Sequence, residues 1–216
     1  DLNKAIVLVT GGSSGIGLAT ARQLKNSGAK VAICARNEDR LKKAAEEISA
    51  FPIQCDVSKE NEVETAIDLV IDHFGDYNVL INNAAYGYFS PLAEIDTDEF
   101  NRMIAVNVTG AMLMAKHSAR HFVEKQSGTI VNISSTAGGK GFAGGTPYVA
   151  SKFALGGMNQ CWMYELRKSN IRVMQVNPSE VQTEFASNAG YEQNLSDRKL
   201  RGEEIAHVIE SLLTLD

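Results

Sequence analysis

The chain has 216 residues, of which 44% are hydrophobic and 22% charged, and its formal net charge at pH 7 is −5. This composition is ordinary for a globular protein, and it predicts a single domain over residues 1–216. The acidic balance and the lack of a basic run argue against binding to nucleic acid or to a membrane surface. With no signal-peptide pattern and three unpaired-looking cysteines, Cys34, Cys55 and Cys161, we expect a soluble cytoplasmic protein.

Short apolar runs alternate with helical patterns along the whole chain. The runs predict strands and the patterns between them predict helices. Such alternation is typical of a doubly wound parallel sheet of Rossmann type, with helices on both faces in three α/β/α layers. The predicted strands are 5–9, 30–35, 52–55, 79–82, 129–134 and 172–176, and the predicted helices are 16–27, 38–49, 59–74, 97–125, 147–169 and 202–213.

The first predicted strand runs directly into a glycine-rich segment, Thr10-Gly11-Gly12-Ser13-Ser14-Gly15-Ile16-Gly17. Glycines let the backbone approach a pyrophosphate, and the amino end of the following helix favours its negative charge. The spacing differs from the common G-x-G-x-x-G fingerprint of dinucleotide sites. The segment predicts a dinucleotide site, and its alternative is a tight turn that binds no ligand.

The end of the second predicted strand bears on the choice of cofactor. An acidic residue at this point would bind the ribose 2′-hydroxyl of NAD(H) and repel a 2′-phosphate. The chain has the small neutral Ala35 there, followed by Arg36. A guanidinium can bind a phosphate through two parallel hydrogen bonds, so we expect NADP(H) rather than NAD(H). The alternative is that Arg36 is a solvated loop cation.

Tyr148 and Lys152 lie four residues apart at the start of a predicted helix. Side chains at this spacing share one helix face, so the ammonium group stands beside the phenol. A free phenol titrates near pH ~10. We expect the positive charge to lower the pKa of Tyr148 towards neutrality, as a general acid–base catalyst requires. Taken alone, the same spacing also fits a solvated helix face.

These motifs, in this order, resemble those of the compact short-chain dehydrogenase/reductase family, and in particular its 3-oxoacyl-[acyl-carrier-protein] reductases. Ala85 and Ser179 differ from the family pattern, which usually has glycine at both positions. Members of the family usually continue past the last helix into a final strand. We expect that strand to be absent from residues 1–216. The matching motifs are Thr10-Gly11-x-x-x-Gly15-Ile16-Gly17, Asp56-Val57, Asn82-Asn83-Ala84-Ala85, Asn107, Ser135, Tyr148-x-x-x-Lys152 and Asn177-Pro178 with Thr183.

The resemblance implies an enzyme that reduces a ketone to an alcohol, reversibly, with NADP(H). It implies that Tyr148 is the general acid or base and that Lys152 lowers its pKa and binds the nicotinamide ribose. Ser135 would stabilise the substrate oxygen, and Asn107 would hold a water in a proton relay; Ser134 is the rival of Ser135, which the spacing to Tyr148 favours. The implied cofactor contacts are Gly11, Ser13, Ser14, Gly15, Ile16, Gly17, Arg36, Asp56, Val57, Asn83, Ala84, Tyr148, Lys152, Pro178, Val181 and Thr183.

A second class of function stays open on the same fold. Some relatives keep the dinucleotide site but act as redox sensors or interaction proteins, and such members typically lose the tyrosine or the lysine. The substrate is equally open between 3-oxoacyl thioesters and small ketones. The aromatic residues expected to line the substrate cleft favour an apolar or aromatic carbonyl, although they could instead pack in a loop core or an interface; they are Tyr86, Tyr88, Phe89, Phe142, Phe185 and Tyr191.

Two further features concern metals and assembly. His117 and His121 stand at a spacing that can bind a metal, but no third ligand follows in a known motif, so we expect a helix-surface position and no metal. The family resemblance implies a homodimer or homotetramer that pairs helices 97–125 and 147–169 with their copies. Apolar side chains on these helices could supply that contact or pack in the core; they are Met112, Leu113, Met158 and Trp162.

Overall fold

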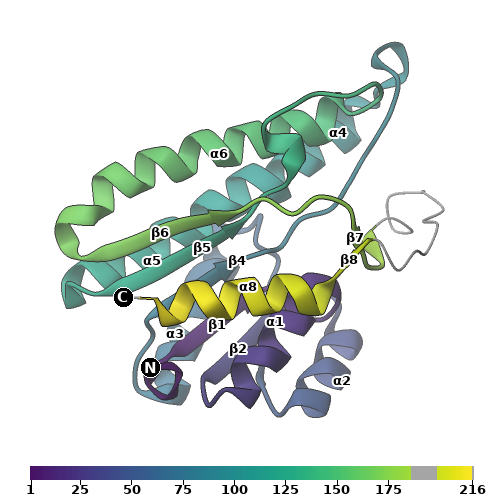
Figure 1. Ribbon diagram of the computed structural model, residues 1–216. Coiled ribbons are helices and arrows are strands. Elements are labelled where there is room, and N and C mark those ends of the chain that lie inside the picture. The colour runs from purple at the N-terminus through teal and green to yellow at the C-terminus, as the bar shows by residue number, and fades with distance from the viewer. Residues whose placement is uncertain (186–198, 216) are drawn as a thin grey trace.

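The computed structural model describes residues 1–185 and 199–215, and it centres on a six-stranded parallel sheet (Figure 1). The strand order is β3-β2-β1-β4-β5-β6, so the order reverses between β1 and β4. This is the doubly wound sheet that the alternating pattern predicts, with most strand boundaries displaced by one residue. The strands are β1 (Ile6–Thr10), β2 (Lys30–Ala35), β3 (Phe51–Gln54), β4 (Val79–Asn82), β5 (Gly128–Ile133) and β6 (Ile171–Val176), with a separate parallel pair of β7 (Val181–Gln182) and β8 (Leu200–Arg201).

Helices cover both faces of the sheet. One layer holds α1 (Gly15–Asn26), α2 (Glu38–Ile48) and α8 (Gly202–Thr214), with α8 packed alongside α1 (Figure 1). The other layer holds α3 (Glu60–Phe74), α5 (Ala111–Lys125) and α6 (Thr146–Leu166). Among the described residues, no helix is long and apolar enough to cross a membrane. Shorter helices are η1 (Leu2–Lys4), η2 (Leu92–Glu94), η4 (Thr136–Gly138) and η5 (Arg167–Ser169).

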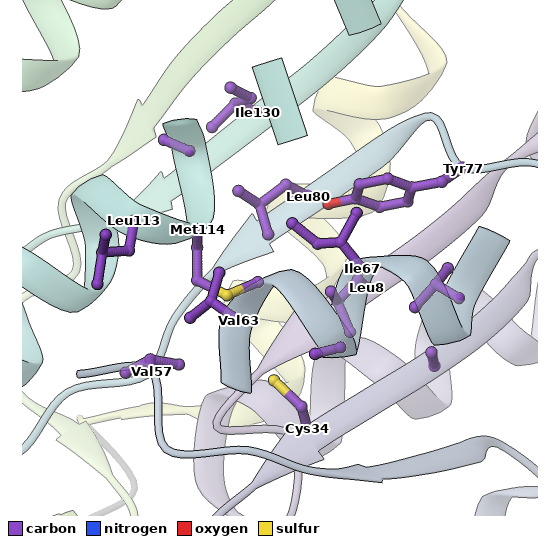
Figure 2. Packing of buried hydrophobic residues seen from close by; sticks show 14 of the residues in the cluster. Leu8, Cys34, Val57, Val63, Ile67, Tyr77, Leu80, Leu113, Met114 and Ile130 are labelled. Atoms are coloured by element: carbon purple, nitrogen blue, oxygen red, sulfur yellow. The ribbon is translucent and has the colours of Figure 1, made fainter. Parts of the chain in front are cut away.

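Each central strand contributes side chains to two hydrophobic cores, because successive side chains point to opposite faces of a sheet. In β1, Leu8 joins the core beneath α3 and α5, whereas Val7 and Val9 join the core beneath α1, α2 and α8. Figure 2 shows the first core, where Leu8 and Leu80 meet side chains of α3 and α5. Burying one such side chain stabilises the fold by about 1.5–3 kcal/mol. The strands are thereby held on both faces, which fixes the loops at their carboxyl ends.

The predicted helix 97–125 is interrupted in the structure. It divides into α4 (Thr97–Ile104), a π-helical segment η3 (Ala105–Gly110) and α5, without a break in the chain direction. Gly110 packs against Val57, and a β-carbon at Gly110 would lie 2.7 Å from the Val57 side chain. Single π-helical turns are frequent at functional sites. Here the turn carries Asn107.

Candidate active site

A cleft of about 1070 Å³ opens along the edge where the strands end. It lies at the switch between β1 and β4, which is where open α/β sheets bind ligands. Of the predicted site residues, Asp56, Gly17 and Asn107 are not in its wall. Tyr88, one of the aromatic residues expected there, is also outside it, and its hydroxyl accepts from the Asp96 backbone N–H. Tyr191 lies outside the described residues. The predicted residues that do line the cleft are Gly11, Ser13, Ser14, Gly15, Ile16, Arg36, Val57, Asn83, Ala84, Ser135, Tyr148, Lys152, Pro178, Val181 and Thr183.

The glycine-rich loop between β1 and α1 is shaped by close backbone contacts. Gly11 and Gly15 have φ values of +64° and +54°, in the left-handed region that favours glycine. A β-carbon at Gly17 would lie 2.4 Å from the Gly11 carbonyl oxygen, so only glycine fits there. Ser14 stands at the amino end of α1, but its side chain makes no capping hydrogen bond. The first turn of α1 is therefore available to bind an anion.

Thr10 is a site residue that sequence reasoning missed. Its Oγ1 accepts hydrogen bonds from the backbone N–H groups of Asn83 and Ala84, both at 2.9 Å. The Asn83 side chain in turn donates to the Thr10 carbonyl at 2.9 Å. These bonds join the loop after β4 to the glycine-rich loop. The signal was present in the sequence, since Thr10 begins the motif that contains Gly11.

Arginine side chains line the end of the cleft beside β2. Arg36 follows the strand directly and is exposed, and Arg40 lies one helical turn further on. Arg40 forms an ion pair with Glu184, which follows β7, whereas Arg36 forms no ion pair with another described residue. Asn37 caps α2 by accepting from the Arg40 backbone N–H at 2.9 Å. Two guanidinium groups at one end of the cleft suit a phosphate-bearing ligand.

Asp56 points away from the main cleft. Its carboxylate accepts from the Ser58 backbone N–H at 3.0 Å and from the Ser58 hydroxyl at 2.7 Å. Burial raises the pKa of Asp56, but these hydrogen bonds and the nearby Arg36 charge outweigh it, so the pKa lies below its ordinary value. The carboxylate faces a smaller hollow of about 440 Å³, which Arg36 also lines. Cys55 and Val57 line the cleft in its place.

Ser135, Tyr148 and Lys152 meet at the other end of the cleft. Ser135 lies just after β5, and its hydroxyl accepts a hydrogen bond from the Ala137 backbone N–H at 3.1 Å while lying close enough to the Tyr148 phenol to affect its pKa. Lys152 lies one turn after Tyr148 in α6, with its Nζ 5.7 Å from the centre of the Tyr148 ring. That Nζ donates to the Ile133 carbonyl at 3.0 Å, and the side chain is buried. Ser134 also lines the cleft, but its hydroxyl has no hydrogen-bond partner among the described residues.

The electrostatics of this group differ from the expectation that Lys152 lowers the pKa of Tyr148. Burial raises the pKa of Tyr148 above its ordinary value, and the nearby Ser135 hydroxyl offsets only part of this effect. Burial also lowers the pKa of Lys152 to about 8. The reason is that both groups lose water in the same wall, while the hydrogen bond of Lys152 goes to the Ile133 carbonyl rather than to the phenol.

Asn107 is buried behind the cleft and fixes the loop after β4. Its Oδ1 accepts from the Tyr86 backbone N–H at 3.0 Å, and its Nδ2 donates to the Tyr86 carbonyl at 2.9 Å. The same Nδ2 donates to the Ser151 hydroxyl at 3.2 Å, next to Lys152 in α6. Both amide protons are therefore used, and one lone pair of Oδ1 remains for a water molecule.

The two histidines of α5 do not converge on one site. His117 is buried rather than on the helix surface as expected, because it packs towards α3 and hydrogen bonds to Glu60 at 3.0 Å. His121 contacts Asp76 instead, at 3.3 Å. Glu60, Glu64 and His117 could bring ligand atoms within 4.8 Å of one another. Both carboxylates, however, already form ion pairs with lysine or arginine side chains of α5.

Comparison with known proteins now identifies the family. A family model described as short chain dehydrogenase matches residues 5–194. The chain belongs to the short-chain dehydrogenase family. A short-chain dehydrogenase reductase from Arabidopsis thaliana, ATA1, is 35% identical and covers 99% of this chain and 80% of its own length. A putative ketoacyl reductase of granaticin polyketide synthase from Streptomyces violaceoruber is 35% identical over 85% of this chain and 70% of its own length.

Solved structures of similar proteins support the same assignment. A 3-ketoacyl-(acyl-carrier-protein) reductase from Brucella melitensis, complexed with NADH, superposes with a TM-score of 0.93 at 28% identity, covering 98% of this chain and 91% of its own. An alcohol dehydrogenase from Thermococcus sibiricus, complexed with 5-hydroxy-NADP, gives 0.89 at 31% identity, covering 97% and 90%. This short-chain dehydrogenase is therefore an oxidoreductase with the Rossmann-like fold of its family. The ligands of these two neighbours differ and do not separate NAD(H) from NADP(H).

Proposed function

We propose that this short-chain dehydrogenase reduces a ketone or similar carbonyl to an alcohol, reversibly, with NADP(H) as its cofactor. The observation that carries the proposal is the layout of one cleft. Ser135, Tyr148 and Lys152 lie at one end, and the glycine-rich loop and Arg36 lie at the other. One cleft therefore holds both a group that can transfer protons and a binding site for an anionic dinucleotide.

The residues present fit a dinucleotide. The backbone can approach a pyrophosphate closely because Gly17 has no side chain and because Gly11 and Gly15 adopt left-handed conformations. The amino end of α1 has no side-chain cap, and it favours the negative charge of the pyrophosphate. Arg36 and Arg40 suit a 2′-phosphate. The reduced nicotinamide supplies a hydride. The other residues assigned to its contacts are Ser13, Ser14, Ile16, Asp56, Val57, Asn83, Ala84, Pro178, Val181 and Thr183.

The protein's own groups then handle the proton. Because burial raises the pKa of Tyr148, the phenol is protonated at pH 7 and can donate to the carbonyl oxygen. Ser135 donates a hydrogen bond to that oxygen as negative charge develops. Lys152 is cationic at this pH, and its charge, 5.7 Å from the centre of the Tyr148 ring, would offset part of the cost of burying the phenolate left behind. We assign Asn107 to a relay that returns the proton through a water held by its free lone pair.

The deciding experiment measures oxidation of NADPH and of NADH by the purified protein, against ketones, diketones and 3-oxoacyl thioesters. The expected result is turnover that is much faster with NADPH than with NADH. Faster turnover with NADH would overturn the role of Arg36 while leaving the reductase intact. Tight NADPH binding without turnover of any carbonyl would instead favour the alternative, a non-catalytic redox sensor or interaction protein.

We also propose that the enzyme works as a cytoplasmic homodimer or homotetramer on a small-molecule substrate. Free Cys34, Cys55 and Cys161 are consistent with a reducing compartment. Of the four side chains expected at the interface, Leu113 is buried, and Met112 and Trp162 pack against the core, so core packing accounts for these three. The outward face of α6 instead carries exposed Phe153 and Tyr164, which are the better candidates for a subunit contact.

A further inference from the structure

Two phenylalanines, Phe89 and Phe185, lie beside the ring of Tyr148, and a third, Phe142, lies beside Phe89. Phe89 follows β4, Phe142 follows β5 and Phe185 follows the short strand β7. The centre of the Tyr148 ring lies 5.3 Å from that of Phe89 and 5.6 Å from that of Phe185. Phe142 lies 6.0 Å from Phe89. All four rings line the same cleft.

The loops bring these rings together through glycines and one backbone bond. A β-carbon at Gly87 would lie 2.8 Å from the Phe89 ring and 2.9 Å from the Phe185 ring, so both rings pack over this glycine. A β-carbon at Gly145 would lie 2.6 Å from Phe142. The loops after β4 and β5 are also joined, because the Ser90 N–H donates to the Gly144 carbonyl at 2.9 Å. The rings therefore have defined places beside Tyr148.

These three rings are not part of the hydrophobic core. Phe142 is 48% exposed, and Phe89 and Phe185 are half-buried. None of the three belongs to either core cluster. Their open surface faces the cleft at the end where Ser135 and Tyr148 present their hydroxyl groups. A substrate whose carbonyl reaches these hydroxyls must place its neighbouring group against aromatic rings.

We propose that the substrate is an aryl ketone, in which an aromatic ring is bonded directly to the carbonyl carbon. Aromatic rings pair best at an offset or edge-to-face, with ring centres about 4.5–7 Å apart. Phe89 and Phe185 already pair with the Tyr148 ring at spacings in this range, so a ring bonded to a carbonyl that reaches the phenol would lie beside the same two side chains. The inference rests on the proposed carbonyl reduction and adds the class of carbonyl. It makes Phe89 and Phe185 residues that determine specificity by contact with the substrate.

The test compares acetophenone with cyclohexyl methyl ketone, which has the same carbon skeleton and a saturated ring. For each ketone, kcat/KM is measured with NADPH for the wild type and for Phe89→Leu and Phe185→Leu. Leucine keeps the side chain apolar but removes the ring. Each variant is expected to lower the ratio of aryl to alkyl kcat/KM by about 2- to 10-fold, mainly through KM for acetophenone. The difference in intrinsic reactivity of the two ketones cancels, because each ratio is compared with that of the wild type.

One control variant and one substitute test variant complete the experiment. Phe51→Leu removes a ring that stacks on His73 outside the cleft and should leave the ratio unchanged. Phe142→Leu removes the most exposed of the three rings, so it tests the idea if the other variants fail to fold by circular dichroism.

The failures of the two proposals can be told apart. Turnover of both ketones with an unchanged ratio in the folded variants would overturn the aryl inference and leave the reductase standing. Turnover confined to carbonyls without an aromatic ring would overturn it equally. Failure to reduce any carbonyl would reject the proposed function itself.

Discussion

The single residue on which catalysis depends most is Tyr148. Its phenol is protonated at neutral pH because burial raises its pKa, and it lines the same end of the cleft as Ser135. Tyr148→Phe should therefore lower kcat for carbonyl reduction by about 10²–10⁴-fold. NADPH affinity, measured by fluorescence titration, should stay close to that of the wild type. A variant that still reduces ketones at the wild-type rate would exclude Tyr148 as the acid.

Lys152 should set the pH dependence of reduction. Burial lowers its pKa to about 8, so the side chain is cationic at pH 7 and loses its proton as the pH rises through 8. Because the pKa of Tyr148 is raised, the phenol stays protonated across this window. We expect kcat/KM for reduction to fall above about pH 8 with the slope of one ionisation. Lys152→Arg keeps its charge over the same range, so this fall should vanish; a wild-type profile that is flat to about pH 10 would refute the assignment.

Arg36 should decide between the two nicotinamide cofactors. Removing a guanidinium that binds a phosphate costs about 1.5–3 kcal/mol, or roughly a 10- to 100-fold loss of affinity. Arg36→Ala should raise KM for NADPH by this factor and leave KM for NADH almost unchanged. Arg22→Ala is the matched control, because Arg22 is also exposed but pairs with Glu47 away from the cleft. Equal losses for both cofactors would mean that Arg36 does not read the 2′-phosphate.

At the scale of elements, the strand-to-helix unit β1–α1 depends on one glycine. A β-carbon at Gly17 would collide with the Gly11 carbonyl and the Asn83 side chain. Gly17→Ala should therefore shift the loop, lower the free energy of unfolding by about 1–3 kcal/mol and weaken NADPH binding. Gly156→Ala in α6 is the control, since its β-carbon would have no neighbour nearer than 3.9 Å. That helical position should gain stability, by up to about 1 kcal/mol. Urea unfolding and NADPH titration measure both effects; equal stability of the two variants would contradict the steric argument.

Strands and helices could be predicted because their patterns are local. The run that became β1 is buried on both faces, so it is apolar throughout. The π-helical segment could not be predicted, because its cause is not local. Asn107 binds the Tyr86 backbone, and Gly110 packs on Val57, more than fifty positions away in the sequence. The spacing of apolar residues that predicts a helix is the same whether or not the helix contains a π-helical turn.

In the candidate site, too, the sequence predicts some features, and others depend on the tertiary fold. Residue types and spacing indicated Tyr148 and Lys152, the family resemblance added Ser135, and the fold brings the three to one place. The direction of the pKa shift of Tyr148 was wrong, because it depends on burial rather than on sequence distance to a charge. Spacing also placed His117 on a surface, whereas the packing of α5 against α3 buries it. Burial and tertiary partners are the quantities that a single sequence leaves open.

At the scale of the whole molecule, the outward face of α6 implies association. Phe153 and Tyr164 are eleven positions apart, about three helical turns, so they lie on one face of the helix. They are 48% and 74% exposed. Large side chains aligned in this way are costly to leave in water. We expect a second copy of the chain to cover this face.

The prediction is a change of oligomeric state. The wild type should elute as a dimer or tetramer in size-exclusion chromatography with light scattering, and Phe153→Arg combined with Tyr164→Arg should elute as a smaller species, because the paired charges cannot be desolvated against their copies. Leu92→Arg places the same charge on an exposed side chain of η2 and should leave the mass unchanged. A monomeric wild type would reject association altogether. An unchanged mass for the folded double variant would instead place the contact on another surface.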